Sequence, residues 1–176
     1  MAQPQVTYDS EAFVQFYKAL AAVDPDLKKA LRKRLMTAAK PVVQEVKQAA
    51  LAIPASREVA GTRKKKGAAL GLRASLAAAA KADFNGTRKG AVVHIRISTT
   101  RFMAVSGERP RTLPYYVEQR RKRPWRHPVF GNKEVWVQQQ GHKFLMPTVI
   151  AHKEKFIGEV KNAVDDALNQ ISTKVK

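Results

Sequence analysis

The 176-residue sequence contains no cysteine, and this absence excludes several kinds of site at once. Disulfide bonds, thiolate zinc sites and cysteine nucleophiles all need a sulfur atom that the chain lacks. Acidic residues are also scarce, with 14 Asp and Glu against 33 Lys and Arg, which gives a formal net charge of +19. Few carboxylates are therefore available to hold a divalent cation beside the basic stretches.

Long hydrophobic runs are missing as well. The longest run of small apolar residues, Ala77 to Ala80, is flanked by Arg73 and Lys81. It is far shorter than the roughly 18 residues of a membrane-spanning helix. The first residues are polar and do not have the basic start and apolar stretch of a secretory signal. We expect a protein that enters no membrane and is made in the cytoplasm.

The remaining composition is typical of a folded domain, with 44% hydrophobic and 27% charged residues. We expect one α+β domain over residues 9–172, in which a long kinked N-terminal helix and a C-terminal helix pack on a small antiparallel sheet. Short tails are expected at residues 1–8 and 173–176. A mobile basic loop at 55–68 and a long extended arm at 100–146 complete the prediction.

Two helices are predicted before residue 54. The first follows two candidate N-cap residues, Asp9 and Ser10, and carries one apolar stripe, formed by Phe13, Phe16, Tyr17 and Leu20. The second begins at Asp24-Pro25-Asp26, because Pro is favoured at the first helical position after a cap. Its apolar residues recur every three or four positions, at Leu27, Leu31, Leu35, Ala38 or Ala39, Val42, Val46, Ala49 and Ile53. Pro41 interrupts this pattern and predicts a kink near residues 37 to 41.

The sheet is predicted from two regions. The alanines of residues 77–84 favour a helix, but apolar and other residues also alternate there as they do in a strand. We prefer the strand, paired in a hairpin with residues 91–98. Further strands are expected near 111–118 and 134–138. The final helix is expected to open at Pro147, with an apolar stripe formed by Ile150, Ile157, Val160, Val164, Leu168 and Ile171.

Catalytic and metal-binding patterns find little support. The four histidines, His94, His127, His142 and His152, have neither metal-ligand spacing nor an acidic cluster beside them. No nucleophile elbow, glycine-rich phosphate loop or acidic triad occurs. We therefore predict no enzyme activity, no catalytic residues, no metal and no cofactor.

Two basic segments carry much of the excess positive charge, and the second, together with Arg126, surrounds Trp125 in the sequence. Their members are Arg63, Lys64, Lys65 and Lys66, and Arg120, Arg121, Lys122 and Arg123. Such segments are compatible with a solvated loop, with an acidic protein neighbour or with phosphate groups, and the residues alone leave all three open.

The order of several phrases resembles the gp-ten-like head–tail joining and tail-completion family of long-tailed bacteriophages. The phrases are a basic helix through Ala38 to Val42, LRAS at Leu72 to Ser75, YYVE at Tyr115 to Glu118, FLMPTV at Phe144 to Val149, and the segment Trp125 to Gln139. The resemblance covers approximately residues 10 to 170. This chain departs from the family pattern in lacking the usual Asp-Thr-Gly before LRAS and in having Gln119 where a glycine is usual.

The resemblance implies a non-enzymatic virion protein that forms a ring, commonly a hexamer, at the neck between portal and tail. Its expected partners are further copies of itself and other neck and tail proteins, with non-specific contact to DNA in the channel left open. We expect aromatic and Arg side chains, the types enriched at interface hot spots, as contacts: Tyr115, Tyr116, Trp125, Arg126, Phe130 and Trp136. The two basic segments, at residues 63–66 and 120–123, are expected to make electrostatic contacts. The alternative is a basic nucleic-acid-binding protein that acts outside the virion.

Overall fold

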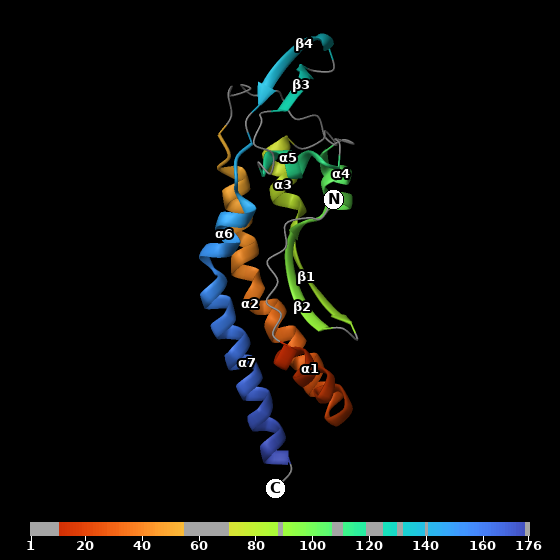
Figure 1. Ribbon diagram of the computed structural model, residues 1–176, viewed down its shortest axis with the longest axis vertical. Coiled ribbons are helices and arrows are strands. Elements are labelled where there is room, and N and C mark those ends of the chain that lie inside the picture. Colours follow the sequence, from red (N-terminus) through yellow and green to blue (C-terminus); the bar gives the residue numbers. More distant parts are fainter. Residues whose placement is uncertain are drawn as a thin grey trace. The chain divides into compact units, whose positions relative to one another are not determined.

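A computed structural model describes residues 11–54, 71–87, 90–106, 111–118, 125–129, 132–139 and 141–174. Its elements, shown in Figure 1, are α1 (Glu11–Val23), α2 (Pro25–Leu51), α3 (Leu72–Ala79), β1 (Ala80–Thr87), β2 (Gly90–Ile97), α4 (Thr99–Ser106), α5 (Leu113–Val117), β3 (Trp125–Val129), β4 (Asn132–Gln139), α6 (Leu145–Ala151) and α7 (Lys153–Lys174). Strand β1 pairs with β2, and β3 pairs with β4. The predicted α+β class, with a long helix near each end of the chain, is confirmed.

Contacts divide the described residues into two compact units. The first unit takes in the described residues between 46 and 80 and between 97 and 147. The second takes in those between 11 and 45, between 81 and 96, and between 148 and 174. Helix α2 begins in the second unit and ends in the first. The predicted loop at 55–68 and the tail at 1–8 lie outside the described residues.

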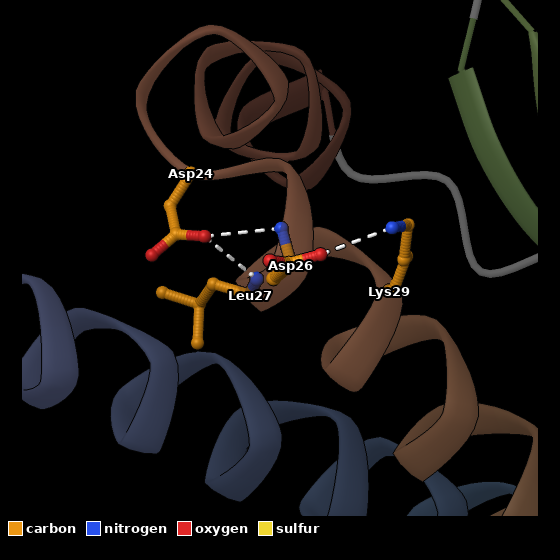
Figure 2. Close-up of polar contacts among 4 residues, drawn as sticks. All are labelled: Asp24, Asp26, Leu27 and Lys29. Carbon is orange, nitrogen blue, oxygen red and sulfur yellow. Dashed lines mark hydrogen bonds and ion pairs between the residues drawn. The ribbon is translucent and has the colours of Figure 1, made fainter.

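The start of α2 is fixed by the predicted cap. Asp24 Oδ1 accepts hydrogen bonds from the backbone N–H groups of Asp26 and Leu27, each at 3.0 Å (Figure 2). Pro25 is the first residue of the helix, where its missing N–H costs nothing because that donor has no partner within the helix. The carboxylate thus satisfies two of the donors that a helix start leaves unpaired.

The apolar stripe of α2 is largely confirmed. Seven of its predicted positions are buried, namely Leu27, Leu31, Leu35, Ala39, Val42, Val46 and Ile53. The one shift is that Ala50 is buried, whereas Ala49 is half-exposed. The helix continues through Pro41 to Leu51, so the loss of one backbone hydrogen bond does not end it.

The core of the second unit joins α1, α2 and α7. Its buried members are Tyr17, Leu20, Leu27, Leu31, Leu35, Val160, Ala163 and Ala167. The hairpin β1–β2 contributes Phe84 and Val93, which pack against this cluster. The Tyr17 and Phe84 rings are tilted at 57° with centroids 5.3 Å apart. Burial raises the pKa of Tyr17, although the nearby Arg32 charge opposes that rise.

The apolar stripe predicted on the last helix is confirmed only in part. Val160 is buried and Ile171 packs against the core, but Ala163 and Ala167 are buried as well, whereas Leu168 is 47% exposed. Small alanine side chains let α7 approach its neighbours closely, and packing therefore favours them over the larger leucine. The helical region also begins earlier than predicted, at Leu145, with Pro147 inside the first turn of α6. A break at His152 separates α6 from α7, and α7 extends to Lys174 rather than ending at the predicted tail.

The hairpin β1–β2 is confirmed, but the prediction that its first strand begins at residue 77 is wrong. Residues 77–79 belong to α3, and the strand begins at Ala80. Leu76 and Ala79 are completely buried on α3, so packing strengthens the helical preference of alanine. The Ser98 N–H, just after β2, donates to the Ala79 carbonyl at 2.8 Å and ties the two ends of the hairpin together.

In the parts of residues 100–146 that the structure describes, the predicted extended arm contains regular structure instead. Helix α4 occupies its beginning, and α5 replaces the strand expected near 111–118. Pro114 lies in the first turn of α5, where its fixed φ suits a helix and removes no needed donor. The strand expected near 134–138 is present in β4, but it pairs with β3 in a second two-stranded sheet. The prediction of one sheet containing all four strands is therefore wrong.

Asp83 links the two strands of the hairpin β1–β2. Its carboxylate contacts Lys81 Nζ at 2.9 Å and Arg96 Nε at 2.5 Å. Partial burial raises the pKa of Asp83, but hydrogen bonds and positive charge from Lys81 and Arg96 outweigh that effect. The pKa of Asp83 is consequently below its ordinary value.

This lowered pKa predicts a pH-dependent contribution to stability. Because the folded state favours the carboxylate, the contribution is complete above the ordinary pKa of 3.8 and is lost as pH falls through the folded-state pKa. Asp83→Asn should therefore reduce the free energy of unfolding at neutral pH by about 1 kcal/mol or less. Denaturation of both proteins at neutral and strongly acidic pH measures this difference. An unchanged difference across that range would contradict the ion-pair explanation.

Candidate interaction surface

Glu118 anchors the segment that precedes α6. The side chain lies just after α5 and is 3% exposed. Its Oε2 accepts hydrogen bonds from the backbone N–H groups of Phe144 at 3.1 Å and Leu145 at 2.9 Å, and its Oε1 accepts one from Met146 at 2.8 Å. One carboxylate therefore satisfies three consecutive backbone donors at the start of a helix.

The partial positive charge at the start of a helix favours this arrangement. The first N–H groups of a helix have no partner within it and carry partial positive charge, so a carboxylate there is stabilised. Hydrogen bonds to an ionised acceptor are stronger than neutral ones. The N–H of His142 also donates to the Val117 carbonyl at 2.6 Å. Residues 117–118 and 142–146 together form what we call the Glu118 clamp.

The clamp joins the two ends of the chain segment that contains the β3–β4 hairpin. The strands are antiparallel, with Arg126 opposite Gln138 and Pro128 opposite Trp136, and the register shifts between Pro128 and Val129. Directly opposed residues share one face of a two-stranded sheet, and alternate residues of a strand share a face. The described side chains on this face are exposed and consist of Arg126, Glu134, Trp136 and Gln138. We call these four residues the hairpin face.

Trp136 is the main apolar group of the hairpin face, since its side chain is 47% exposed. Its neighbours on the face supply a guanidinium, a carboxylate and a carboxamide, so hydrogen-bonding groups surround an apolar ring. Interfaces between proteins commonly combine an aromatic anchor with a polar rim. The hairpin face therefore has the chemistry of a protein-binding surface.

The other predicted contact residues do not gather on the hairpin face. Trp125 pairs with Gln139 and Trp136 with Pro128, so the two tryptophans occupy positions of opposite parity in the ladder. Tyr115 and Tyr116 are half-buried on α5, with ring centroids 6.0 Å apart in an edge-to-face arrangement. Phe130 and the basic residues 63–66 and 120–123 lie outside the described residues. Among the predicted contacts, the structure brings Arg126 and Trp136 together on one face.

The role of Glu118 is not predicted by the sequence, in which the residue stands out only as the last member of YYVE. No local signal reveals its function, because its partners are 26 to 28 residues further along the chain. The contact joins two phrases already singled out, since Phe144, Leu145 and Met146 open FLMPTV.

The described residues offer little else of chemical interest. Within those ranges, no group of three or more His, Asp or Glu side chains is arranged to hold a metal ion. No helix in the described part of the chain has both the length and the hydropathy needed to cross a bilayer.

Comparison with known proteins adds no relative: no family model, no curated protein and no solved structure matches this chain significantly.

Proposed function

We propose that the chain is a non-enzymatic structural protein of a tailed phage that forms a ring at the head–tail junction. In this role it joins or completes the tail, and its partners are further copies of itself and other neck and tail proteins. The ring is expected to be a hexamer, as is common in the family that the sequence resembles. The protein is made in the host cytoplasm and resides in the virion.

The observation that carries this proposal is the hairpin face held by the Glu118 clamp. An assembly subunit needs a contact surface whose geometry is set before it meets its neighbour, because preorganisation reduces the entropy lost on binding. The clamp fixes both ends of the segment with a buried carboxylate and three hydrogen bonds. Trp136 and Arg126 on that segment are of the types that dominate binding energy at interfaces.

Trp136→Ala tests the contact. We expect the variant to fold normally, because the side chain is half-exposed, and to lose about 2 kcal/mol of association free energy. That loss weakens assembly by roughly 30-fold at each contact. Sedimentation velocity and native mass spectrometry over a concentration series measure it, and thermal unfolding checks the fold.

A matched control is Val23→Ala, which also truncates an exposed apolar side chain, 66% exposed and outside the hairpin. It should leave assembly unchanged. The proposed contact is wrong if Trp136→Ala assembles as the wild type does. A Trp136→Ala protein that fails to fold would show that the ring belongs to the core instead.

The alternative, a nucleic-acid-binding protein that acts outside the virion, is favoured by the net charge of +19. Electron microscopy and mass measurement of the purified protein separate the two. Closed rings support the assembly role. A chain that stays monomeric at every concentration, and binds duplex DNA more tightly than about 10⁻⁶ M at physiological salt, supports the alternative, because generic charge gives weaker binding.

A further inference from the structure

Helix α2 carries more positive charge than its surroundings neutralise. Between residues 25 and 45 it contains two acidic residues, Asp26 and Glu45, and six basic ones, Lys28, Lys29, Arg32, Lys33, Arg34 and Lys40. Lys29 pairs with Asp26 (Figure 2), and Arg34 pairs with Asp166. Glu45 is already engaged by His152. Four of the six basic side chains therefore have no carboxylate partner among the described residues.

Two of these four basic side chains lie on the side of α2 that faces away from the core. Lys33 and Lys40 are both exposed, and a spacing of seven residues places them on nearly the same side, about 10 Å apart along the axis. Leu31 and Leu35 are buried on the opposite side. Lys29, one turn before Lys33, extends the same row of charges.

The other two cations are held by aromatic rings. The Arg32 guanidinium lies 5.4 Å from the Phe84 ring centroid, and Lys28 Nζ lies 4.7 Å from that of Tyr17. A cation–π contact positions the side chain without cancelling its charge. Arg32 is also exposed, and it lies beside Lys33 in the sequence. We call Arg32, Lys33 and Lys40 the basic face of α2.

The basic face of α2 is charged and lacks apolar side chains, and this composition indicates what kind of partner it binds. Protein interfaces have an apolar core that is depleted in lysine. The exposed large hydrophobic side chain of α2 is Leu51, its last residue and eleven positions beyond Lys40. The basic face itself therefore offers no such core. A nucleic-acid backbone requires none, because its binding is driven by counterion release as cations replace the ions around its phosphates.

We propose that the basic face of α2 docks on the phosphate backbone of duplex nucleic acid without reading its bases. We identify this partner because the dense negative charge of its phosphates is complementary to the positive charge of the basic face. The inference is independent of the proposed ring, because it concerns one helix of a single chain. We expect an affinity in the non-specific range, about 10⁻⁴ to 10⁻⁶ M at physiological salt.

The test uses the full chain and a mixed-sequence DNA duplex of about 30 base pairs, with fluorescence anisotropy at about 50 to 200 mM salt. For B-DNA, each neutralised phosphate contributes about 0.9 to the slope of log K against log salt. The double variant Lys33→Gln/Lys40→Gln should therefore make that slope shallower by about 1.8.

The matched control is Lys155→Gln/Lys161→Gln, which removes the same charge from exposed positions of α7. Acidic residues such as Glu154 and Glu159 alternate with these lysines, so the slope should stay at the wild-type value. Thermal unfolding verifies both double variants. If Lys33→Gln/Lys40→Gln is unstable, the single variant Lys33→Gln should show half the change.

Several outcomes would overturn the proposal. Equal changes in both double variants would mean that diffuse charge binds the duplex, and an unchanged slope in the α2 variant would place binding elsewhere. Absence of duplex binding, together with binding to polyglutamate, would identify an acidic protein as the partner. By contrast, an α2 variant that has the shallower slope and still forms rings normally would support the proposal and show that this face is separate from the assembly contact.

Discussion

Glu118→Ala is expected to lower the free energy of unfolding by about 3 kcal/mol or more. The substitution removes the acceptor of three backbone N–H groups, two of which make fully buried hydrogen bonds. A buried donor without a partner costs about 1 to 3 kcal/mol, and the side chain leaves a space as well. Urea denaturation measures the loss, and hydrogen exchange at residues 144–146 shows whether it is local.

Two comparison variants make this test specific. Glu118→Gln keeps one oxygen acceptor but turns an amide donor toward other donors, so it should be intermediate. Glu159→Ala removes an exposed glutamate from α7 and should change stability by about 0.5 kcal/mol or less. Equal stability of Glu118→Ala and Glu159→Ala would show that the clamp contributes nothing.

Leu35→Ala is the second substitution for which we expect a large effect, a loss of about 2 to 5 kcal/mol. Leu35 is 1% exposed within the core that joins α1, α2 and α7. Truncation there removes buried methyl groups and leaves a cavity that a close-packed interior fills only in part.

The matched control is Leu168→Ala, which makes the same chemical change at a side chain that is 47% exposed. We expect it to cost about 1 kcal/mol or less, because much less apolar surface leaves water at that position. Chemical denaturation of both variants measures the contrast. Equal losses would mean that α7 buries the stripe expected from its sequence, with Leu168 inside.

Helix α2 could be predicted because several local signals agree on it. Asp24 supplies the cap, Pro25 suits the first position, and the apolar residues repeat at one period over more than six turns. Each of these signals acts within a few residues of the chain. These local preferences therefore do not depend on how the rest of the chain packs.

Predictions that depended on a choice between two local patterns were less successful. The alanines at 77–79 satisfy both a helix and a strand, and the burial of Leu76 in α3 decided for the helix. On α7, the sequence offers a large apolar stripe and an overlapping one of smaller residues. Close packing against other helices selected Ala163 and Ala167, and nothing near them in the sequence indicates this.

The candidate site shows the same division. The sequence singled out Trp136 and Arg126 by residue type, but only the ladder register places them on one exposed face. Glu118 was not predicted at all, because its three partners are more than 25 residues away. The contribution of that carboxylate to stability depends on its hydrogen bonds to a buried helix start, and that buried site exists only in the folded chain.

The sequence by itself determined the class of the fold, the α2 helix with its cap and core face, the hairpin β1–β2 and the large excess of positive charge. These features follow from backbone preferences and from hydrophobic periodicity, which act over short stretches. Only the tertiary structure decided which apolar residues of α7 are buried, how the strands pair, where Glu118 finds its partners and which cations of α2 have no carboxylate partner among the described residues. Those outcomes depend on contacts between residues far apart in the chain, and such contacts form only when the elements pack.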